Sequence, residues 1–226
     1  MCSRFTLISN PETVRATFGH RERPNYPPRY NIAPTQPIHI VRLAANSARE
    51  LVLVRWGLLP SWVKDPDSFS TLINARAETA AQKPSFRAGM RHRRCLIPAD
   101  GFIEWTGPRG AKRPFYLKRR DEGLLAFAGL WEHWQGADGA EIESAVILTT
   151  HANASVSPLH HRMPVILDPE DFDAWLDCKR VSPADIADLM VPADDMLMEA
   201  VELGSKINNP GNEGPEVLEA VGGGGV

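Results

Sequence analysis

Segments with the composition of short β-strands recur along this chain without a regular alternation of strand and helix. They are apolar, or they alternate apolar and polar residues, over 38–43, 51–56, 115–118, 124–130, 145–150 and 165–167. Loops rich in Pro, Gly and Asn separate them, which disfavours a doubly wound parallel sheet. We therefore expect an α+β fold with mainly antiparallel strands.

Three segments carry a helix-start signal, in which a capping side chain precedes a proline at the first helical position. These are Asn10-Pro11, Asp168-Pro169 and Ser182-Pro183, which predict helices over 11–18, 169–177 and 183–190. No internal repeat or linker divides the chain. We expect a single domain over 1–221 and a disordered, Gly-rich tail over 222–226.

The composition is that of a globular protein, with 43% hydrophobic and 23% charged residues among 226. Because the net charge is only −3, a nucleic-acid partner would require basic residues gathered on one face. Basic residues do gather in the middle of the chain: Arg87, Arg91, Arg93, Arg94, Arg109, Lys112 and Arg113.

The three cysteines, Cys2, Cys95 and Cys178, show no CxxC spacing. This pattern indicates neither a disulfide framework nor a zinc site, so we expect no metal and a reducing, cytoplasmic setting. The chain has no apolar run of transmembrane length and no signal peptide, so we expect no membrane partner.

Cys2 directly follows the initiator Met1. Removal of Met1 would leave a residue with both a free α-amine and a thiol, two nucleophiles in fixed proximity that together trap aldehydes. The alternative is a frayed chain end with no role.

Several polar residues stand in segments where a turn or strand does not require them. Asn31 either serves a site or bonds its own backbone in a turn. Asn74, Arg76 and Glu78 alternate with small or apolar residues, so a strand would present all three on one face, as a site or as an exposed edge with a salt bridge.

Three further residues, Glu104, His160 and Trp62, each have a functional and a structural interpretation. Glu104 stands between Ile103 and Trp105, either in an apolar pocket that suits a general acid or base, or exposed and paired with Arg. His160 lies in a loop as a proton shuttle or a solvated side chain. Trp62 offers a surface on which bases stack, whereas Trp56 fits the core.

Taken in order, these segments closely resemble the SRAP family (SOS response-associated peptidase). The resemblance continues to Asn208-Asn209 and to residues 213–216. One departure is Ser3, which stands where the family usually has Gly. The matching segments are MCSRF at 1–5, RYNIAPT at 29–35, WGLLPSW at 56–62, NARAET at 74–79, RRCLIPADGFIEW at 93–105 and HHRMP at 160–164.

The resemblance implies antiparallel strands wrapped as an open barrel with peripheral helices, and a basic channel for single-stranded DNA. It implies an abasic-site processing protein, in which Cys2, freed of Met1, forms a thiazolidine crosslink with the ring-opened aldehyde. This crosslink would shield the lesion in the DNA damage (SOS) response. Asn74, Glu104 and His160 would assist Cys2.

We expect DNA contacts from Arg4, Asn31, Trp62, Arg76 and Arg87, with the arginines and Asn31 on phosphates. The expected partner is single-stranded DNA containing abasic sites, with no cofactor. We expect a monomer in the cytoplasm that joins the nucleoid when bound to DNA.

Three alternatives remain open. The imine formed with the abasic sugar could eliminate the 3′ phosphate, which is an abasic-site lyase activity. Cys2 could act as the nucleophile of an autoproteolytic cysteine peptidase, the hydrolase class that the family name records. The chain could also bind single strands without a covalent step.

Overall fold

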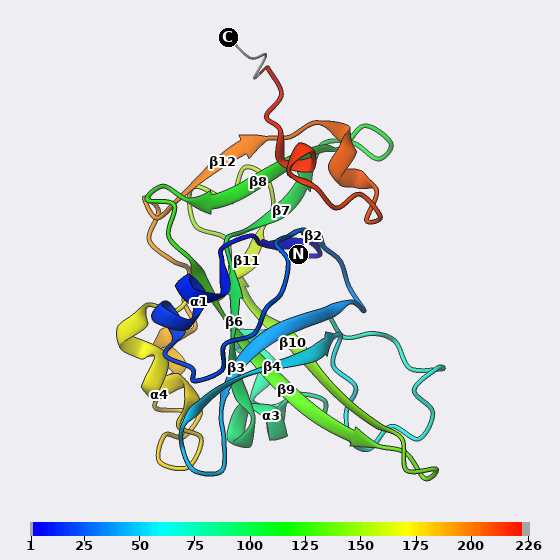
Figure 1. Ribbon diagram of the computed structural model, residues 1–226, viewed down its shortest axis with the longest axis vertical. Helices are drawn as coiled ribbons and strands as arrows, with labels where there is room; N and C mark the ends of the chain where they lie inside the picture. The colour runs from blue at the N-terminus through cyan, green and yellow to red at the C-terminus, as the bar shows by residue number, and fades with distance from the viewer. Residues whose placement is uncertain (1, 223–226) are drawn as a thin grey trace.

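The computed structural model describes residues 2–222 (Figure 1). Residues 223–226 of the tail expected to be disordered lie outside the described residues. The described strands form two sheets that share one hydrophobic core. The expected single domain over 1–221 stays a prediction.

Five strands of the larger sheet close into a barrel. Their order is β10-β4-β3-β6-β9, and β9 pairs with β10 again, so the ring of pairings is complete. All of these pairs are antiparallel except β10 with β4. The strands are β3 (Pro37–Leu43), β4 (Arg49–Trp56), β6 (Arg94–Ala99), β9 (Leu125–Gln135) and β10 (Glu141–His151).

Two short strands extend the barrel sheet from β10. β5 (Asn74–Arg76) pairs with it in parallel and β11 (Arg162–Pro164) pairs with it antiparallel. Both meet the same part of β10, because Thr149 pairs with Arg76 on one side and with Pro164 on the other. The segments around Asn74 and His160 are thereby brought to one end of β10.

The smaller sheet stays open and is antiparallel throughout, in the order β12-β8-β7-β1-β2. Only Asp100 separates β6 of the barrel from β7 of this sheet, so the chain passes from one sheet to the other at a single turn. Its strands are β1 (Phe5–Leu7), β2 (Arg29–Ile32), β7 (Gly101–Thr106), β8 (Arg113–Arg119) and β12 (Met198–Glu202).

The expected α+β class with mainly antiparallel strands and peripheral helices is confirmed. The pairings add that the barrel closes, which an open barrel does not, and that a second sheet lies beside it. Closure follows from the length of β10, whose eleven residues pair with β9 on one edge and with β4 and β5 on the other.

An aromatic cluster joins the two sheets. The Phe5 ring of β1 meets the Trp56 ring of β4 at 5.1 Å and the Phe127 ring of β9 at 6.0 Å, both edge to face. Phe102 of β7 also meets Phe127 at 6.0 Å. These contacts hold β1, the strand that follows Cys2, firmly on the barrel.

The helices follow the sequence signals in part. α1 (Pro11–Phe18) begins as predicted, with the Asn10 side chain accepting from the Thr13 N–H at 2.9 Å. The predicted helix over 169–177 is split into a 3₁₀ turn, Pro169–Asp171, and α4 (Phe172–Leu176). Two short helices, α2 (Ala77–Ala80) and α3 (Arg87–His92), were not predicted.

The predicted helix over 183–190 is wrong, because only a 3₁₀ turn, Ala187–Leu189, forms there. Ile186 is buried, and Leu189 and Met190 are half-buried against the core. The backbone bonds, however, run between residues i and i+3, as from the Leu189 N–H to the Ile186 carbonyl at 3.2 Å, so the turn is 3₁₀ and not α. The predicted strand over 165–167 is limited to an isolated bridge between Ile166 and Phe127. None of the helices in residues 2–222 is long and apolar enough to cross a membrane.

Candidate functional site

Cys2 lies just before β1 and is completely buried. The Arg4 carbonyl accepts a hydrogen bond from the Ile103 N–H at 2.9 Å and another from the Cys2 thiol at 3.7 Å. Because Ile103 belongs to β7, these bonds hold the chain at Cys2 against the strand that carries Glu104. Cys2 is an ordered part of the structure and not a frayed end.

Asn74 approaches Cys2 from the barrel. It is the first residue of β5, and its Nδ2 donates a 2.7 Å hydrogen bond to the Cys2 carbonyl oxygen. In β5 the middle residue, Ala75, is buried in the core, which leaves Asn74 and Arg76 on the opposite face. The prediction that Asn74 and Arg76 share one face is confirmed, but Glu78 lies in the first turn of α2 (Ala77–Ala80) and leaves that face.

Glu104 is buried in β7, with 3% of its surface exposed, so it is not the exposed strand residue of the second alternative. Burial raises the pKa of the Glu104 carboxyl above its usual range, because the charged form loses its hydration. Burial likewise raises the pKa of the Cys2 thiol, and the Glu104 carboxylate raises it further. The two groups are thus close enough to interact, and both favour their protonated forms.

His160 is fixed through the backbone of Arg162. The Arg162 N–H donates to His160 Nδ1 at 3.0 Å. The buried Arg162 guanidinium in turn binds both carboxylate oxygens of Glu78, at 2.6 and 2.9 Å, and the Thr149 carbonyl. Burial lowers the pKa of His160, so the imidazole is neutral near pH 7.

Lys112, which the sequence did not single out as a site residue, lies near both acid–base groups. Its charge acts on the Glu104 carboxyl and on the His160 imidazole, in each case lowering the pKa. Lys112 is exposed, in the loop between β7 and β8. The charge of Lys112 thus reaches both Glu104 and His160.

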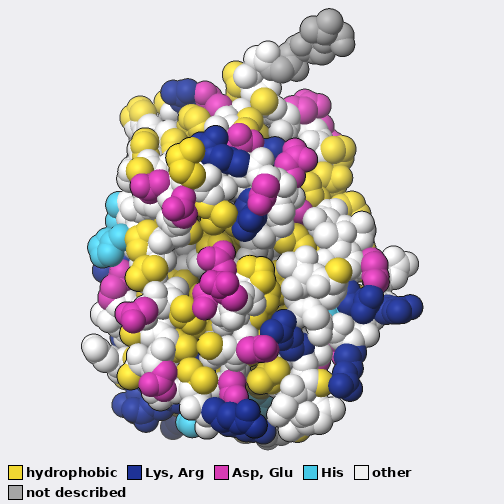
Figure 2. Space-filling model, turned by 90° about the vertical axis from the view of Figure 1, so that its left-hand side faces the viewer, with side chains coloured by type: hydrophobic (Ala, Val, Ile, Leu, Met, Phe, Trp, Pro, Cys, Tyr) yellow, Lys and Arg dark blue, Asp and Glu magenta, His cyan; other side chains and the backbone are white. Residues whose placement is uncertain are grey.

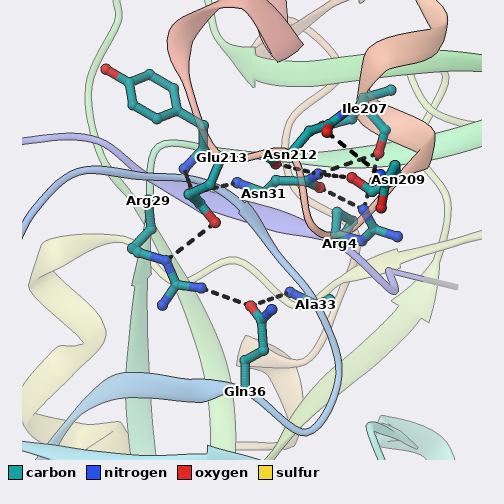
Figure 3. Close-up of polar contacts among 10 residues, drawn as sticks. Arg4, Arg29, Asn31, Ala33, Gln36, Ile207, Asn209, Asn212 and Glu213 are labelled. Atoms are coloured by element: carbon teal, nitrogen blue, oxygen red, sulfur yellow. Dashed lines mark hydrogen bonds and ion pairs between the residues drawn. The ribbon is translucent and has the colours of Figure 1, made fainter.

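The expectation that Asn31 contacts phosphate needs correction. Asn31 is completely buried, its Oδ1 accepts from the Arg4 guanidinium at 2.5 Å, and its Nδ2 donates to three carbonyls near the C-terminus (Figure 3). A side chain whose amide is used in this way has no free group to offer a phosphate. Asn31 instead holds Arg4, two residues from Cys2.

The other residues expected to contact DNA, Arg76, Trp62 and Arg87, lie in different parts of the fold. Arg76 is exposed at the end of β5, where its charge acts on His161. Trp62 is 57% exposed in the loop after β4 and meets Phe69 edge to face at 5.7 Å. Arg87 begins α3, which lies well below β2 and β7 in Figure 1, so the structure does not bring it to Cys2.

The basic stretch in the middle of the sequence does not form one basic face. Arg94 is buried and donates to the backbone carbonyls of four residues, while Arg93 pairs with Glu132 and Arg113 with Glu202. On the face shown in Figure 2, acidic and basic side chains are interspersed. Much of this positive charge therefore serves the fold.

The residues of 2–222 contain no cluster of three or more His, Cys, Asp or Glu that could hold a metal ion. What the structure does assemble is a buried cysteine at the second position, contacted by an amide, beside a buried carboxyl and near a neutral imidazole. The fold and the site define a class of α+β barrel proteins with a buried cysteine at the second position.

The chain belongs to the SRAP family, because residues 1–210 match the family described as SOS response associated peptidase. Two relatives show how far the similarity extends. Abasic site processing protein YoqW of Bacillus subtilis (strain 168) is 40% identical over 225 residues, covering 97% of this chain and 100% of YoqW. Abasic site processing protein HMCES of Gallus gallus is 32% identical over 262 residues, covering 96% and 77%.

A solved structure has the same fold. The crystal structure of a protein from Bacteroides thetaiotaomicron superposes with a TM-score of 0.87 at 27% identity, covering 97% of this chain and 100% of the other. The fold expected for the family is thus confirmed for this sequence.

Proposed function

We propose that this chain processes abasic sites in single-stranded DNA by forming a thiazolidine between Cys2 and the lesion's aldehyde. The observation that carries the proposal is the convergence on Cys2 of the Asn74 amide and the Glu104 carboxyl, which come from different sheets. The names of the relatives, abasic site processing proteins, support the same substrate class.

The reaction begins with the closed sugar. Glu104, whose raised pKa keeps a proton available, donates to the ring oxygen as the hemiacetal opens. With Met1 removed, Cys2 carries a free α-amine, and because the reference pKa of an α-amine is about 7.7–8.0, part of it is neutral near pH 7. The amine attacks C1′, and the aldehyde oxygen leaves as water to give an imine.

Ring closure uses the thiol. The sulfur of Cys2 bonds to the imine carbon, and the thiol proton passes to the nitrogen, with neutral His160 as the relay. The products are the crosslink and one water, so no oxidant or reductant is required. Asn74 fixes the carbonyl of Cys2 and thus the direction of both nucleophiles.

Exposed cations place the DNA. Arg76 and Lys112, on the strand and loop beside the acid–base groups, are suited to bind the phosphates on either side of the lesion. The exposed ring of Trp62 is suited to stack on a neighbouring base.

The alternatives differ in their products. Elimination of the 3′ phosphate from the imine would cut the strand, and a peptidase would cleave peptides in a Cys2-dependent way. A binding module would leave no covalent product.

The test is a denaturing gel of the protein incubated with a single-stranded oligonucleotide that carries one abasic site. We expect a shifted band that survives heat and denaturant, that is absent with undamaged DNA and that is lost in Cys2→Ala. Equal amounts of the stable band from Cys2→Ala would overturn the thiazolidine.

A further inference from the structure

A segment near the C-terminus, residues 205–213, reaches back to the strands around Cys2, and we name it the C-terminal clasp. It begins with a 3₁₀ helix, Ser205–Asn208, and continues as a loop. The proposed reaction uses none of its residues. Its contacts nevertheless converge on the neighbours of the two central groups.

The first set of contacts surrounds Arg4. The Arg4 guanidinium donates to Asn31 Oδ1 at 2.5 Å and to the Ile207 carbonyl at 3.0 Å. Asn31 itself donates to the carbonyls of Asn209 and Asn212, both at 2.9 Å (Figure 3). The clasp therefore holds the Arg4 side chain directly and through Asn31, and Arg4 is the residue whose carbonyl accepts from the Cys2 thiol.

The second set of contacts joins the clasp to β2. The Glu213 carboxylate accepts from the Tyr30 N–H and, at 3.1 Å, from the Asn31 N–H, and it lies 3.4 Å from the Arg29 guanidinium. These bonds occupy the edge of β2, the outermost strand of the open sheet, beside β1. One carboxylate thus ties the clasp to three consecutive residues of that strand (Figure 3).

The third contact reaches the neighbour of Glu104. The Trp105 indole N–H donates to Asn208 Oδ1 at 2.7 Å, and the Arg4 guanidinium lies over the same ring at 5.5 Å. The clasp consequently touches both Arg4, two residues from Cys2, and Trp105, next to Glu104.

We propose that the C-terminal clasp is a positioning element for the Cys2 site, which sets the distance between Cys2 and Glu104 by holding Arg4 and Trp105. The role of the clasp in the reaction rests on the proposed function, whereas its effect on the packing of Cys2 is independent of that function. Because a misplacement on the order of 1 Å can cost about 100-fold in rate, loosening the clasp should slow crosslinking strongly.

The experiment compares Glu213→Ala and Asn208→Ala with two controls. Glu213→Gln keeps an oxygen acceptor for the Tyr30 and Asn31 N–H groups, so it should restore the wild-type behaviour. Glu219→Ala removes a more exposed carboxylate that pairs with Lys206 of the clasp but contacts neither Arg4 nor β2. All four changes are on the surface or half-buried, so the variants are expected to fold.

The first readout is the alkylation rate of each cysteine by iodoacetamide, resolved by peptide mapping. Cys2 and Cys95 are both fully buried, but Cys95 lies in the barrel strand β6, whereas the hydrogen bonds of the clasp run to Arg4 and to β2 and β7 of the open sheet. We expect Glu213→Ala and Asn208→Ala to speed alkylation of Cys2 by roughly tenfold and to leave Cys95 unchanged, as local opening requires. Unchanged Cys2 rates, or equal acceleration at Cys95, would overturn the proposal.

The second readout is single-turnover crosslinking to abasic single-stranded DNA. We expect the maximal rate at saturating DNA to fall on the order of tenfold in the Ala variants, while half-saturation changes less than about twofold. A change confined to half-saturation would make the clasp a DNA contact and would contradict positioning. If the wild type forms no crosslink, the proposed function fails, and the alkylation rates still decide the question of the clasp.

Discussion

The side-chain amide of Asn74 donates a 2.7 Å hydrogen bond to the carbonyl oxygen of Cys2, 72 residues earlier in the chain. The bond joins a strand attached to the barrel with the segment that enters the open sheet. It fixes the backbone of the residue that we propose to be the nucleophile.

Asn74→Ala removes this hydrogen bond. We expect crosslinking at saturating DNA to slow by about 10- to 100-fold, because both nucleophiles of Cys2 lose a fixed direction. The free energy of unfolding should fall by only about 1 kcal/mol, the usual net contribution of one hydrogen bond. Rapid-quench crosslinking and urea denaturation measure the two effects, with Asn46→Ala, in the turn between β3 and β4, as the control. A rate within twofold of that control would argue against the role of Asn74.

Glu104→Gln should raise the stability of the protein at neutral pH while it lowers the rate of crosslinking. Burial raises the pKa of Glu104 in the folded state, so above the unfolded value of about 4.3 the folded protein binds more protons than the unfolded chain. The free energy of unfolding of the wild type therefore falls as the pH rises through that range. Gln carries no charge, so the variant should gain stability relative to the wild type above about pH 4.3 and show no such gain below it.

The same variant should lose crosslinking by roughly 100-fold or more, because it has lost the proton donor. Denaturation at several pH values, paired with crosslinking at pH 7, measures both effects. A stability difference that does not change with pH would contradict the buried, protonated carboxyl.

Glu78→Ala tests the support of His160. Removing the carboxylate leaves the buried Arg162 guanidinium without its ion-pair partner. We expect a loss of about 1–2 kcal/mol of stability, less than for a fully buried pair because the Glu78 side chain is 39% exposed. Crosslinking should slow as well, since the Arg162 backbone holds the His160 ring. Glu12→Ala, which breaks an exposed pair with Arg15 on α1, should change neither property.

Arg76→Ala tests the electrostatic contact with DNA. Arg76 is exposed, and none of the ion pairs among residues 2–222 involves it, so its charge is available to a phosphate. We expect weaker binding of undamaged single strands and a slope of log affinity against log salt that is shallower by about 1. Arg113→Ala is the matched control, because its guanidinium already pairs with Glu202. Equal slopes of log affinity against log salt for the two variants would contradict a contact between Arg76 and a DNA phosphate.

Local sequence patterns predicted those helices and strands whose signal lies within the segment itself. The Asn10-Pro11 signal gave α1 because the cap and the apolar face lie within nine residues, and most barrel strands were visible as apolar runs. The signal at Ser182-Pro183 did not give an α-helix, although Ile186, Leu189 and Met190 pack on the core. There the Asp185 carboxylate accepts the Ser182 N–H at 2.8 Å in a turn that the chain does not continue as an α-helix.

Which site residues come together could be predicted only through the family resemblance, because Cys2, Asn74 and Glu104 meet through strand pairing. Asn31 shows the limit most clearly. The three carbonyls to which its amide donates lie 176 to 181 residues away and Arg4 lies 27 residues away, so no local pattern distinguishes a buried amide that holds Arg4 from one that faces a phosphate. The roles of Arg162 and of the clasp depend on similar long-range contacts.

Intact mass spectrometry of the protein, before and after exposure to a single-stranded oligonucleotide with one abasic site, tests the central claim most directly. Before exposure, we predict the mass of the chain without Met1. Afterwards, we predict a species equal to protein plus oligonucleotide less one water, resistant to denaturant and absent in Cys2→Ala. A chain that lacks Met1 and yet gives no adduct, or one whose adduct persists undiminished in Cys2→Ala, would contradict the account.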